Sequence, residues 1–304
     1  MTKPKIKTYS TGSFRDNFMQ QEASLDSMMK SGFDKFFIVL VEEMLRVIKL
    51  PVPPVRATSH SLIYLTSGEA IMSIGSDTHK IFKGQCFVVP AGQVFSFRHR
   101  DINKGYLCNF HDDSVIGKFG KNALLKDFEF LKPWANPCIT LQPASAKHVE
   151  QLFRRILQEY KQHGLTHRDI IQSNFIALLC ELKEAHTTVA RATQTQAAQL
   201  TNRFKELLFK NLRTHHRVSD YAAFLNISPN HLNKAVKAVT GKSPTKWIDE
   251  AIVLEAKVLL HQSDLSIAAI AEDVGFLDPS YFTRLFKKHE GLTPVAFRKR
   301  IEKS

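Results

Sequence analysis

The chain has 304 residues, enough for about two domains. Apolar residues make up 43% of it and aromatic residues 10%, which is typical of a globular protein and excludes a disordered one. The formal net charge of +13 favours a polyanionic partner such as nucleic acid or a membrane surface. No run approaches the roughly 18 apolar residues of a membrane span, and no secretory signal is visible. We therefore expect a soluble, cytoplasmic protein without a membrane partner.

The four cysteines are far apart and include no C-x-x-C pair, and no histidines cluster beside them. This spacing indicates neither a zinc site nor a disulfide framework. We expect buried free thiols in a reducing compartment. The four are Cys86, Cys108, Cys138 and Cys180.

Short apolar runs separated by Gly, Ser, Asp and Pro fill the region from Phe36 to about Cys108. The spacing predicts an antiparallel β-sandwich or barrel, whereas the first 35 residues give no clear pattern. The runs are FFIVLV, SLIYLT, AIMSIG, CFVVP, VFSF and YLCNF.

A helical period replaces the β pattern from Ser145 to Glu184, with a break at Gly164. These two amphipathic helices either pack on the barrel or form a homodimer through residues 145–186, and both alternatives stay open. Residues 187–199, TTVARATQTQAAQ, are small and polar without an apolar period, which favours a linker. The predicted domains are therefore residues 1–186, a linker at 187–199, and a helical domain at 200–304.

The helical domain contains an internal repeat. Ala222 matches Ala271 at an offset of 49, and Gly241 matches Gly291 at an offset of 50. The extra residue falls between the two helices of each unit, where a change in length costs little. The repeat predicts two helix-turn-helix units, at about residues 218–239 and 267–289, whose second helices can enter a major groove.

Each unit has the same start and stop signals. Its turn carries Asn226 or Gly275, residue types that tolerate left-handed backbone. Its second helix opens with Ser-Pro at 228–229 or Asp-Pro at 278–279, a capping side chain before Pro at the first helical position. A glycine then ends the helix.

A helical wheel places the apolar residues of both second helices on one side, together with His289. These residues are Leu232, Ala235, Val236 and Val239 in the first helix and Phe282, Leu285 and Phe286 in the second. Amides, hydroxyls and cations share the other side, without Asp or Glu. A plain solvated surface is the alternative, but two acid-free faces in register favour contact with DNA. Amides and Arg suit base edges, and lysines suit phosphates. The predicted DNA-binding residues are Asn230, His231, Asn233, Lys234, Lys237, Ser280, Tyr281, Thr283, Arg284, Lys287 and Lys288.

One long helix is expected between the units, from Thr245 to His261. Seventeen residues at 1.5 Å each span roughly 26 Å. A rod of this length could hold two reading helices near the separation of successive major grooves, about 34 Å.

Residues 200–299 resemble the DNA-binding domain of the AraC/XylS family of bacterial transcription regulators. The resemblance rests on SIAAIAEDVGFLDPSYFTRLFKKHEGLTPVAFR, ISPNHLNKAVKAVTGKSPTKWI and AKVLL. It implies groove-facing roles for Asn230, Asn233, Lys234, Ser280, Thr283 and Arg284, with Lys287 near phosphate. Val236 and Ala238 stand where the family usually has Phe-Lys. Because the first unit then has fewer cations, we expect it to bind phosphate more weakly than the second.

The β region resembles the cupin-type barrel of such regulators, because GQCFVVPAGQVF fits G-x5-P-x-G from Gly84 to Gly92. Phe95 stands where a metal-binding cupin needs His, and His60, His79 and His99 do not have the spacing of a metal site. We therefore expect no metal, no cofactor and no enzymatic activity.

The expected fold is α+β and multidomain: a cupin-like barrel, two helices, and an all-α double helix-turn-helix domain. The predicted function is sequence-specific regulation of transcription through double-stranded DNA, with a small-molecule effector in the barrel and RNA polymerase as partner if the protein activates. Three alternatives stay open: a constitutive binder whose barrel only dimerises, a cupin enzyme fused to a DNA-binding domain, and a non-specific chromatin-like or RNA-binding protein.

Overall fold

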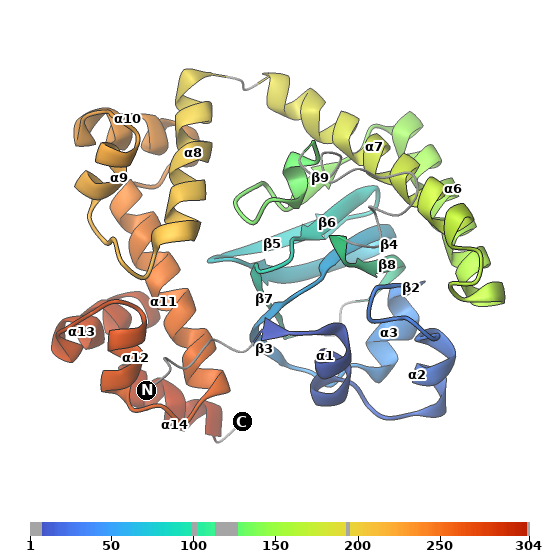
Figure 1. The fold of residues 1–304 in the computed structure, drawn as a ribbon, viewed down its shortest axis with the longest axis horizontal. Coiled ribbons are helices and arrows are strands. Elements are labelled where there is room, and N and C mark those ends of the chain that lie inside the picture. The colour runs from blue at the N-terminus through green and yellow to red at the C-terminus, as the bar shows by residue number, and fades with distance from the viewer. Residues whose placement is uncertain (1–7, 99–101, 113–126, 193–194, 303–304) are drawn as a thin grey trace. The chain divides into compact units, whose positions relative to one another are not determined.

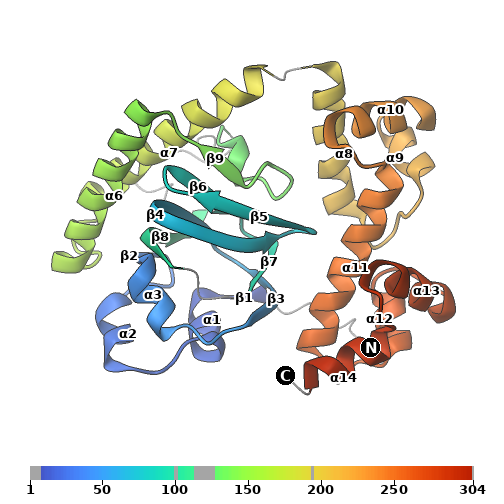
Figure 2. The same cartoon turned by 180° about the vertical axis from the view of Figure 1, so that it is seen from behind.

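The computed structural model describes residues 8–98, 102–112, 127–192 and 195–302 (Figures 1 and 2). They form two compact units, one from Thr8 to Ala192 and one made of the C-terminal helices. None of the helices in these ranges is long and apolar enough to cross a membrane.

The N-terminal unit is built on a mixed, barrel-like sheet whose two layers share one long strand, β4. The first half of β4 pairs with β8 and β6, and its second half pairs with β5 and β7. Within the described ranges the ladder runs from β1 to β9 and does not close into a ring. The strands are β1 Thr8–Tyr9, β2 Phe36–Leu40, β3 Val52–Ala57, β4 His60–Ile74, β5 Asp77–Phe82, β6 Gln85–Val89, β7 Val94–Phe97, β8 Asn103–Phe110 and β9 Cys138–Thr140.

The predicted β pattern is confirmed, but β5 is not among the expected runs and three further differences appear. The runs SLIYLT and AIMSIG form the single strand β4, because Gly68 lies inside it with a φ of +76° near a register shift and does not end it. The strand β3 is not among the expected runs, because Pro53 and Pro54 lack ladder donors; the register shifts between Val52 and Val55. The run FFIVLV ends early, because a helix begins at Val41.

Three short helices lie near the first strands. Two of them are in the first 35 residues, where no pattern was recognised, and the third replaces the end of an expected strand. They are α1 Thr11–Phe18, α2 Ala23–Met28 and α3 Val41–Val47. A single 3-10 turn, η1 Glu129–Leu131, lies before β9.

Two long helices, α6 (Pro143–His163) and α7 (Arg168–Ala192), pack on the sheet of their own unit. Phe153 of α6 stacks on Tyr64 and Tyr106, and Phe175 of α7 meets Phe36 edge to face, with ring centroids 5.3 to 5.6 Å apart. Packing on the home domain therefore accounts for their buried faces. Dimerisation through residues 145–186 stays a prediction.

The stretch predicted as a linker is mostly helical. Helix α7 continues through Ala192, and α8 begins at Gln196 with the Thr195 side chain as its cap. Small polar residues without an apolar period can still continue a helix, because Ala and Gln are good helix formers. The composition of residues 187–199 therefore does not predict their backbone conformation. The domain boundaries stay a prediction.

The expectation for the cysteines and histidines of the N-terminal unit is confirmed only in part. All four cysteines are free, and Cys86 and Cys108 are buried, but Cys138 is half-buried and Cys180 is exposed, so a buried thiol was the wrong prediction for these two. His60 is buried and bonded through Nε2 to Asp112 (2.8 Å) and through Nδ1 to the N–H of Ala91 (3.1 Å). His99 lies outside the described residues.

The C-terminal unit is all α-helical. Its members are α8 Gln196–Asn211, α9 Val218–Phe224, α10 Pro229–Thr240, α11 Pro244–Gln262, α12 Ile267–Asp273, α13 Pro279–Glu290 and α14 Pro294–Glu302. The predicted units at 218–239 and 267–289 correspond to α9–α10 and α12–α13, and the predicted long helix is α11. Figure 1 shows α10 and α13 near different ends of α11.

Candidate nucleic-acid interface

The helices α10 and α13 start and stop where their sequences predict. The Ser228 hydroxyl accepts from the N–H of His231 (3.2 Å), and the Asp278 carboxylate accepts from the N–H of Ser280 (2.8 Å). A proline occupies the first turn of each helix. Each ends at a left-handed glycine, Gly241 or Gly291.

The buried faces of the two helices match the wheel at six of eight positions. The core residues are Leu232, Ala235 and Val236 in α10 and Phe282, Leu285 and Phe286 in α13. Val239 is 44% exposed, so its assignment to the buried side was wrong; it lies in the last turn, just before Gly241, where the helix end is open to solvent. His289 is half-buried and lies 3.5 Å from Asp249 of α11.

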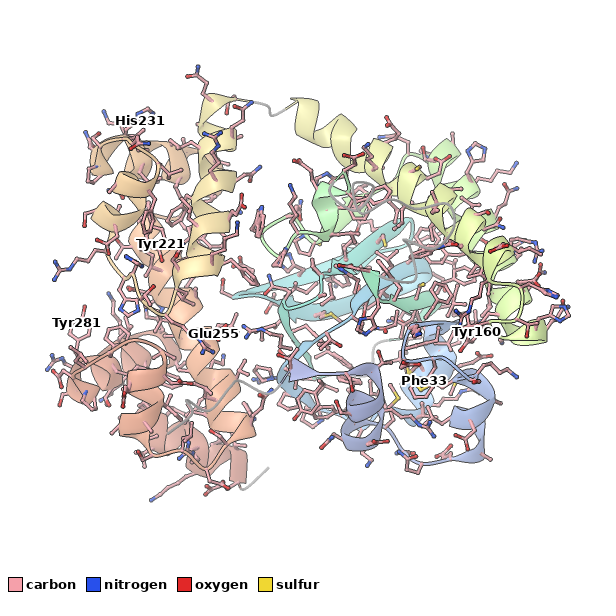
Figure 3. All side chains as sticks on the ribbon, in the orientation of Figure 1. Phe33, Tyr160, Tyr221, His231, Glu255 and Tyr281 are labelled. Atoms are coloured by element: carbon pink, nitrogen blue, oxygen red, sulfur yellow. The ribbon has the colours of Figure 1, made fainter. Side chains whose placement is uncertain are left out.

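Nine of the eleven predicted DNA-binding residues are exposed, and the other two, Asn233 and Thr283, are half-buried. His231 on α10 and Tyr281 on α13 both lie at the outer surface of the unit (Figure 3). The Asn233 amide donates to the carbonyl of Pro229 (3.1 Å), which leaves its own oxygen as the free acceptor. Arg284 lies over the Tyr281 ring, 5.8 Å from its centroid.

The cations of these faces differ from those around α11. Within the described residues, no ion pair involves Lys234, Lys237, Arg284 or Lys287. The cations around α11 are paired with acids instead, among them Lys242 with Glu250 (2.8 Å), Lys257 with Glu290 (3.0 Å) and Arg213 with Glu255 (3.8 Å). Unpaired cations beside exposed amides and hydroxyls are suited to phosphates and base edges.

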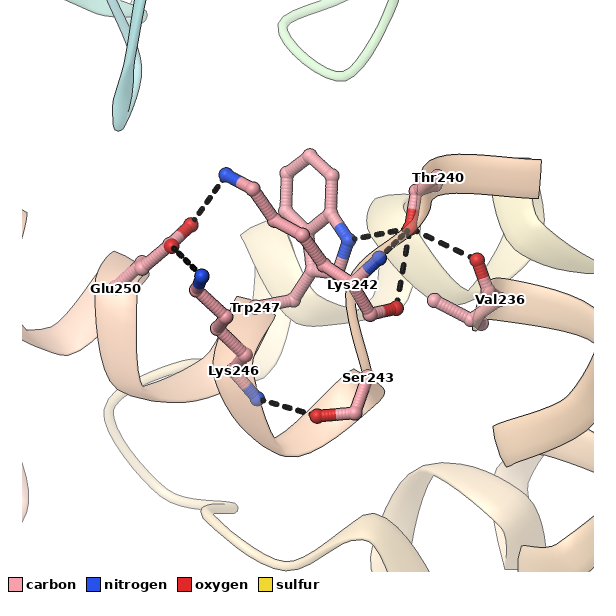
Figure 4. Close-up of polar contacts among 7 residues, drawn as sticks. All are labelled: Val236, Thr240, Lys242, Ser243, Lys246, Trp247 and Glu250. Carbon is pink, nitrogen blue, oxygen red and sulfur yellow. Dashed lines mark hydrogen bonds and ion pairs between the residues drawn. The ribbon is translucent and has the colours of Figure 1, made fainter. Parts of the chain in front are cut away.

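A polar network fixes α10 against the start of α11 (Figure 4). The indole Nε1 of Trp247 donates to Thr240 Oγ1 (3.1 Å), and that hydroxyl donates to the carbonyl of Val236 (2.8 Å). Lys242 lies over the indole ring at 5.3 Å while it pairs with Glu250. The contact between Trp247 and Thr240 could not be predicted from the sequence, because a helical wheel does not show the partner of the Trp247 N–H.

The second unit is attached to α11 through charges near the end of α13. Glu290 pairs with Lys257, and both side chains are only 21% exposed. Burial raises the pKa of Asp249, while the neighbouring His289 opposes this increase. These pairs attach the side of α13 that faces α11, and its exposed face stays accessible to a ligand.

His216, before α9, ties the first unit to the turn of the second. Its ring stacks on Phe276 with centroids 4.7 Å apart. Gly275 has a φ of +93°, and a Cβ there would lie 2.3 Å from the carbonyl oxygen of Arg213 and 2.6 Å from the His216 ring. Glycine is therefore required at 275 for both conformation and space. The sequence indicated the turn but not this contact.

Comparison with known proteins agrees with this geometry. Residues 221–300 match a family model described as a helix-turn-helix domain. The MmsAB operon regulatory protein of Pseudomonas aeruginosa is 26% identical over 253 residues, 81% of this chain and 77% of that protein. The HTH-type transcriptional activator Btr of Bacillus subtilis is 25% identical over 252 residues, 81% of this chain but only 45% of its own length.

A solved structure, the C-terminal domain of AraT, a response regulator from Geobacillus stearothermophilus, is 28% identical, with a TM-score of 0.33 over 35% of this chain and 88% of that domain. The family model covers both helix-turn-helix units found in the structure, and the relatives that extend over most of the chain are regulators. The chain is therefore a transcription regulator whose C-terminal third is a helix-turn-helix DNA-binding domain, similar to those of AraC-type regulators.

Proposed function

We propose that α10 and α13 read two successive major-groove segments of one duplex. Asn230, Asn233 and Lys234 would contact bases from α10, and Ser280, Thr283 and Arg284 from α13. Lys237, Lys287 and Lys288, with His231 and Tyr281 beside them, would contact the phosphate backbone. The unpaired cations of the two exposed faces are the observation that carries this proposal. The 19 residues of α11 span about 28 Å, near the groove separation of about 34 Å.

Binding of the full-length chain to a selected duplex and to a scrambled duplex, over a range of salt, tests this function. A specific regulator should prefer the selected duplex by about 10³-fold or more. A chromatin-like protein would bind both duplexes alike, and an RNA-binding protein would prefer RNA. The proposal places the chain with the chromosome in the cytoplasm, acting through binding and not catalysis. An activator of this kind would also contact RNA polymerase.

The second part of the proposal is that the barrel binds an effector. A cavity of about 130 Å³ lies within the N-terminal unit. Its wall is mainly apolar and includes no charged residue, with Phe37, Phe87, Phe95 and Met72 among its members. A carboxylate or an ammonium ion would lose its hydration there without a counter-charge. The cavity therefore favours a neutral, largely apolar molecule.

The few polar groups of the cavity narrow this class further. Asn109 is satisfied, because it donates to Ser59 (2.9 Å) and Ser61 (3.0 Å) and accepts from Thr11 (3.2 Å). Asn103 donates to the carbonyl of Glu69 (2.8 Å), but its buried Oδ1 has no partner within the described residues. An effector that donates one hydrogen bond, such as an alcohol or an amide, would satisfy this oxygen.

Thermal-shift measurements on the full-length chain, with neutral alcohols and their carboxylic acid counterparts, test the effector. The alcohols should stabilise the protein and change its DNA affinity, and Asn103→Leu should reduce the preference for the donor group. If nothing binds and DNA affinity is constant, the alternative is a barrel that only dimerises through residues 145–186. Sedimentation of a variant disrupted on the exposed side of α6 would then show a loss of dimer and of site affinity together.

A further inference from the structure

A second site lies at the hairpin between α6 and α7 and shares no residue with those assigned to DNA or effector. Glu159 and His163 are one turn apart at the end of α6, and Gly164 ends that helix with a φ of +59°. The chain then turns, and the backbone carbonyl of His167 accepts from the N–H of Ile170 (3.1 Å) at the start of α7. The turn returns His167 to the side of α6 that carries Glu159.

The three side chains converge. One ligand atom from each of Glu159, His163 and His167 lies within 4.8 Å of the other two, and this is the one such group of His, Cys, Asp and Glu in the described part of the chain. Glu159 Oε1 lies 2.6 Å from His167 Nδ1, and the two imidazole centroids are 4.6 Å apart. Both histidines are exposed to solvent, which gives an ion a route of entry.

The carboxylate is held in place from its other side. Glu159 Oε2 accepts from Arg155 Nη1 (2.8 Å), and the Glu159 side chain is only 6% exposed. Oε1 is then the oxygen directed at the histidines. A second hydrogen bond of this kind usually orients the carboxylate ligand of a metal ion.

We propose that Glu159, His163 and His167 bind a borderline divalent transition metal ion, with Zn²⁺ the best match. Two imidazoles and one carboxylate are common ligands of Zn²⁺, at about 2.0–2.2 Å, with water at the fourth position. Nitrogen-rich ligands exclude Mg²⁺ and Ca²⁺, which prefer oxygen. Binding of the ion would replace the 2.6 Å hydrogen bond between Glu159 Oε1 and His167 Nδ1, and both exposed imidazoles would have to rotate to reach tetrahedral separations. The ion would join the end of α6 to the start of α7 and fix the hairpin.

The proposal is tested by titration of the metal-stripped full-length chain with Zn²⁺ against a chromogenic chelator. We expect one equivalent of tightly bound ion. His163→Gln with His167→Gln should weaken that binding by at least tenfold. His148→Gln is the matched control, because it removes another exposed histidine of α6 and should change nothing. Co²⁺ in place of Zn²⁺ should give the visible absorption of a tetrahedral site in wild type and in the control only.

Two results would overturn the site. One is equal Zn²⁺ affinity in the wild type and the double variant, and the other is the lack of a bound equivalent in the wild type. His163→Gln alone repeats the test with a single exposed substitution, should the double variant be poorly folded. Circular dichroism of each variant separates a lost ligand from a lost fold. DNA binding by these variants is a separate readout and bears only on the proposed function.

Discussion

The two helix-turn-helix units have the same frame and different chemistry. Each has a capped helix that begins with proline, ends at a left-handed glycine and buries three apolar residues. The exposed faces differ: α10 presents amides and lysines, and α13 presents hydroxyls, Arg284 and two lysines. Between the two units, the positions with similar residue types are the caps, the terminal glycines and the buried residues, which determine how the two helices pack. Those that diverge are the ones available to a ligand, as expected if each unit reads a different sequence.

The units also differ in how their turns are confined. Asn226 takes a φ of 54° in the first turn and is exposed. Gly275 takes the same role in the second turn but is enclosed by Arg213 and His216. Neighbouring histidines contact one unit each, since His215 meets Phe224 and His216 stacks on Phe276. The segment before α9 therefore supports both units, and the second turn tolerates less change.

The largest expected effect comes from Gly275→Ala. Its Cβ would lie 2.3 Å from a backbone oxygen that cannot rotate away, in a conformation that L residues avoid. Strain and overpacking together should lower the free energy of unfolding by roughly 3 kcal/mol. Urea denaturation followed by Trp247 fluorescence, in a Trp134→Phe background, measures it. Asn226→Ala, at the open turn, should cost only about 1 kcal/mol. Equal costs at the two turns would remove the contrast between them.

Arg284→Ala should have the next largest effect, on DNA affinity and not on folding. Loss of a base contact should cost about 1–3 kcal/mol of binding free energy and relax preference at one base position. Lys287→Ala should weaken all duplexes alike and reduce the salt slope by about one. Fluorescence anisotropy across a set of single-base variants of the site distinguishes the two. An unchanged sequence preference in Arg284→Ala would refute its place in the groove.

Trp247→Phe tests the network that holds α10. The substitution removes the hydrogen bond to Thr240, whose hydroxyl keeps its bond to Val236, and should destabilise the domain by about 1 kcal/mol. Thr240→Val removes these two bonds and also the hydrogen bond that the hydroxyl accepts from the N–H of Lys242 (3.2 Å), and it should cost more. Neither variant should alter sequence preference, because these side chains lie behind the exposed face. Thermal unfolding by circular dichroism and a repeat of the duplex selection check the two parts.

The smallest expected effect is on pH dependence. Burial lowers the pKa of His216 below its usual 6.5, although its backbone hydrogen bonds oppose this. In the unfolded chain His216 has its usual pKa, so the unfolded state binds a proton at a higher pH than the folded state does. The free energy of unfolding should therefore fall as the pH drops through 6.5 and below. His216→Phe should reduce that slope, measured as the midpoint of urea unfolding between pH 5 and 8. His215→Gln is the neighbouring control, and an equal loss of slope in it would contradict the assignment.

The bounds of the two exposed helices could be predicted from residues close together in the sequence. Contacts between residues far apart in the sequence could not. Caps, prolines and glycines fix the bounds of α10 and α13, since each acts within one turn. Gly275 was predicted from its turn, but its enclosure by His216 depends on a residue from before α9. The strand β3 was missed because its two prolines are read locally as breakers, whereas a bulge accommodates them. The metal-ligand cluster was missed because Gly164 ends the helix and only the folded turn returns His167.

Selection from random duplexes with the full-length chain tests the central claim most directly. The account predicts two preferred blocks about one helical turn apart, in which Lys234→Ala alters one block and Arg284→Ala alters the other. A single block, or two blocks that neither substitution changes, would contradict the paired reading of the duplex by α10 and α13.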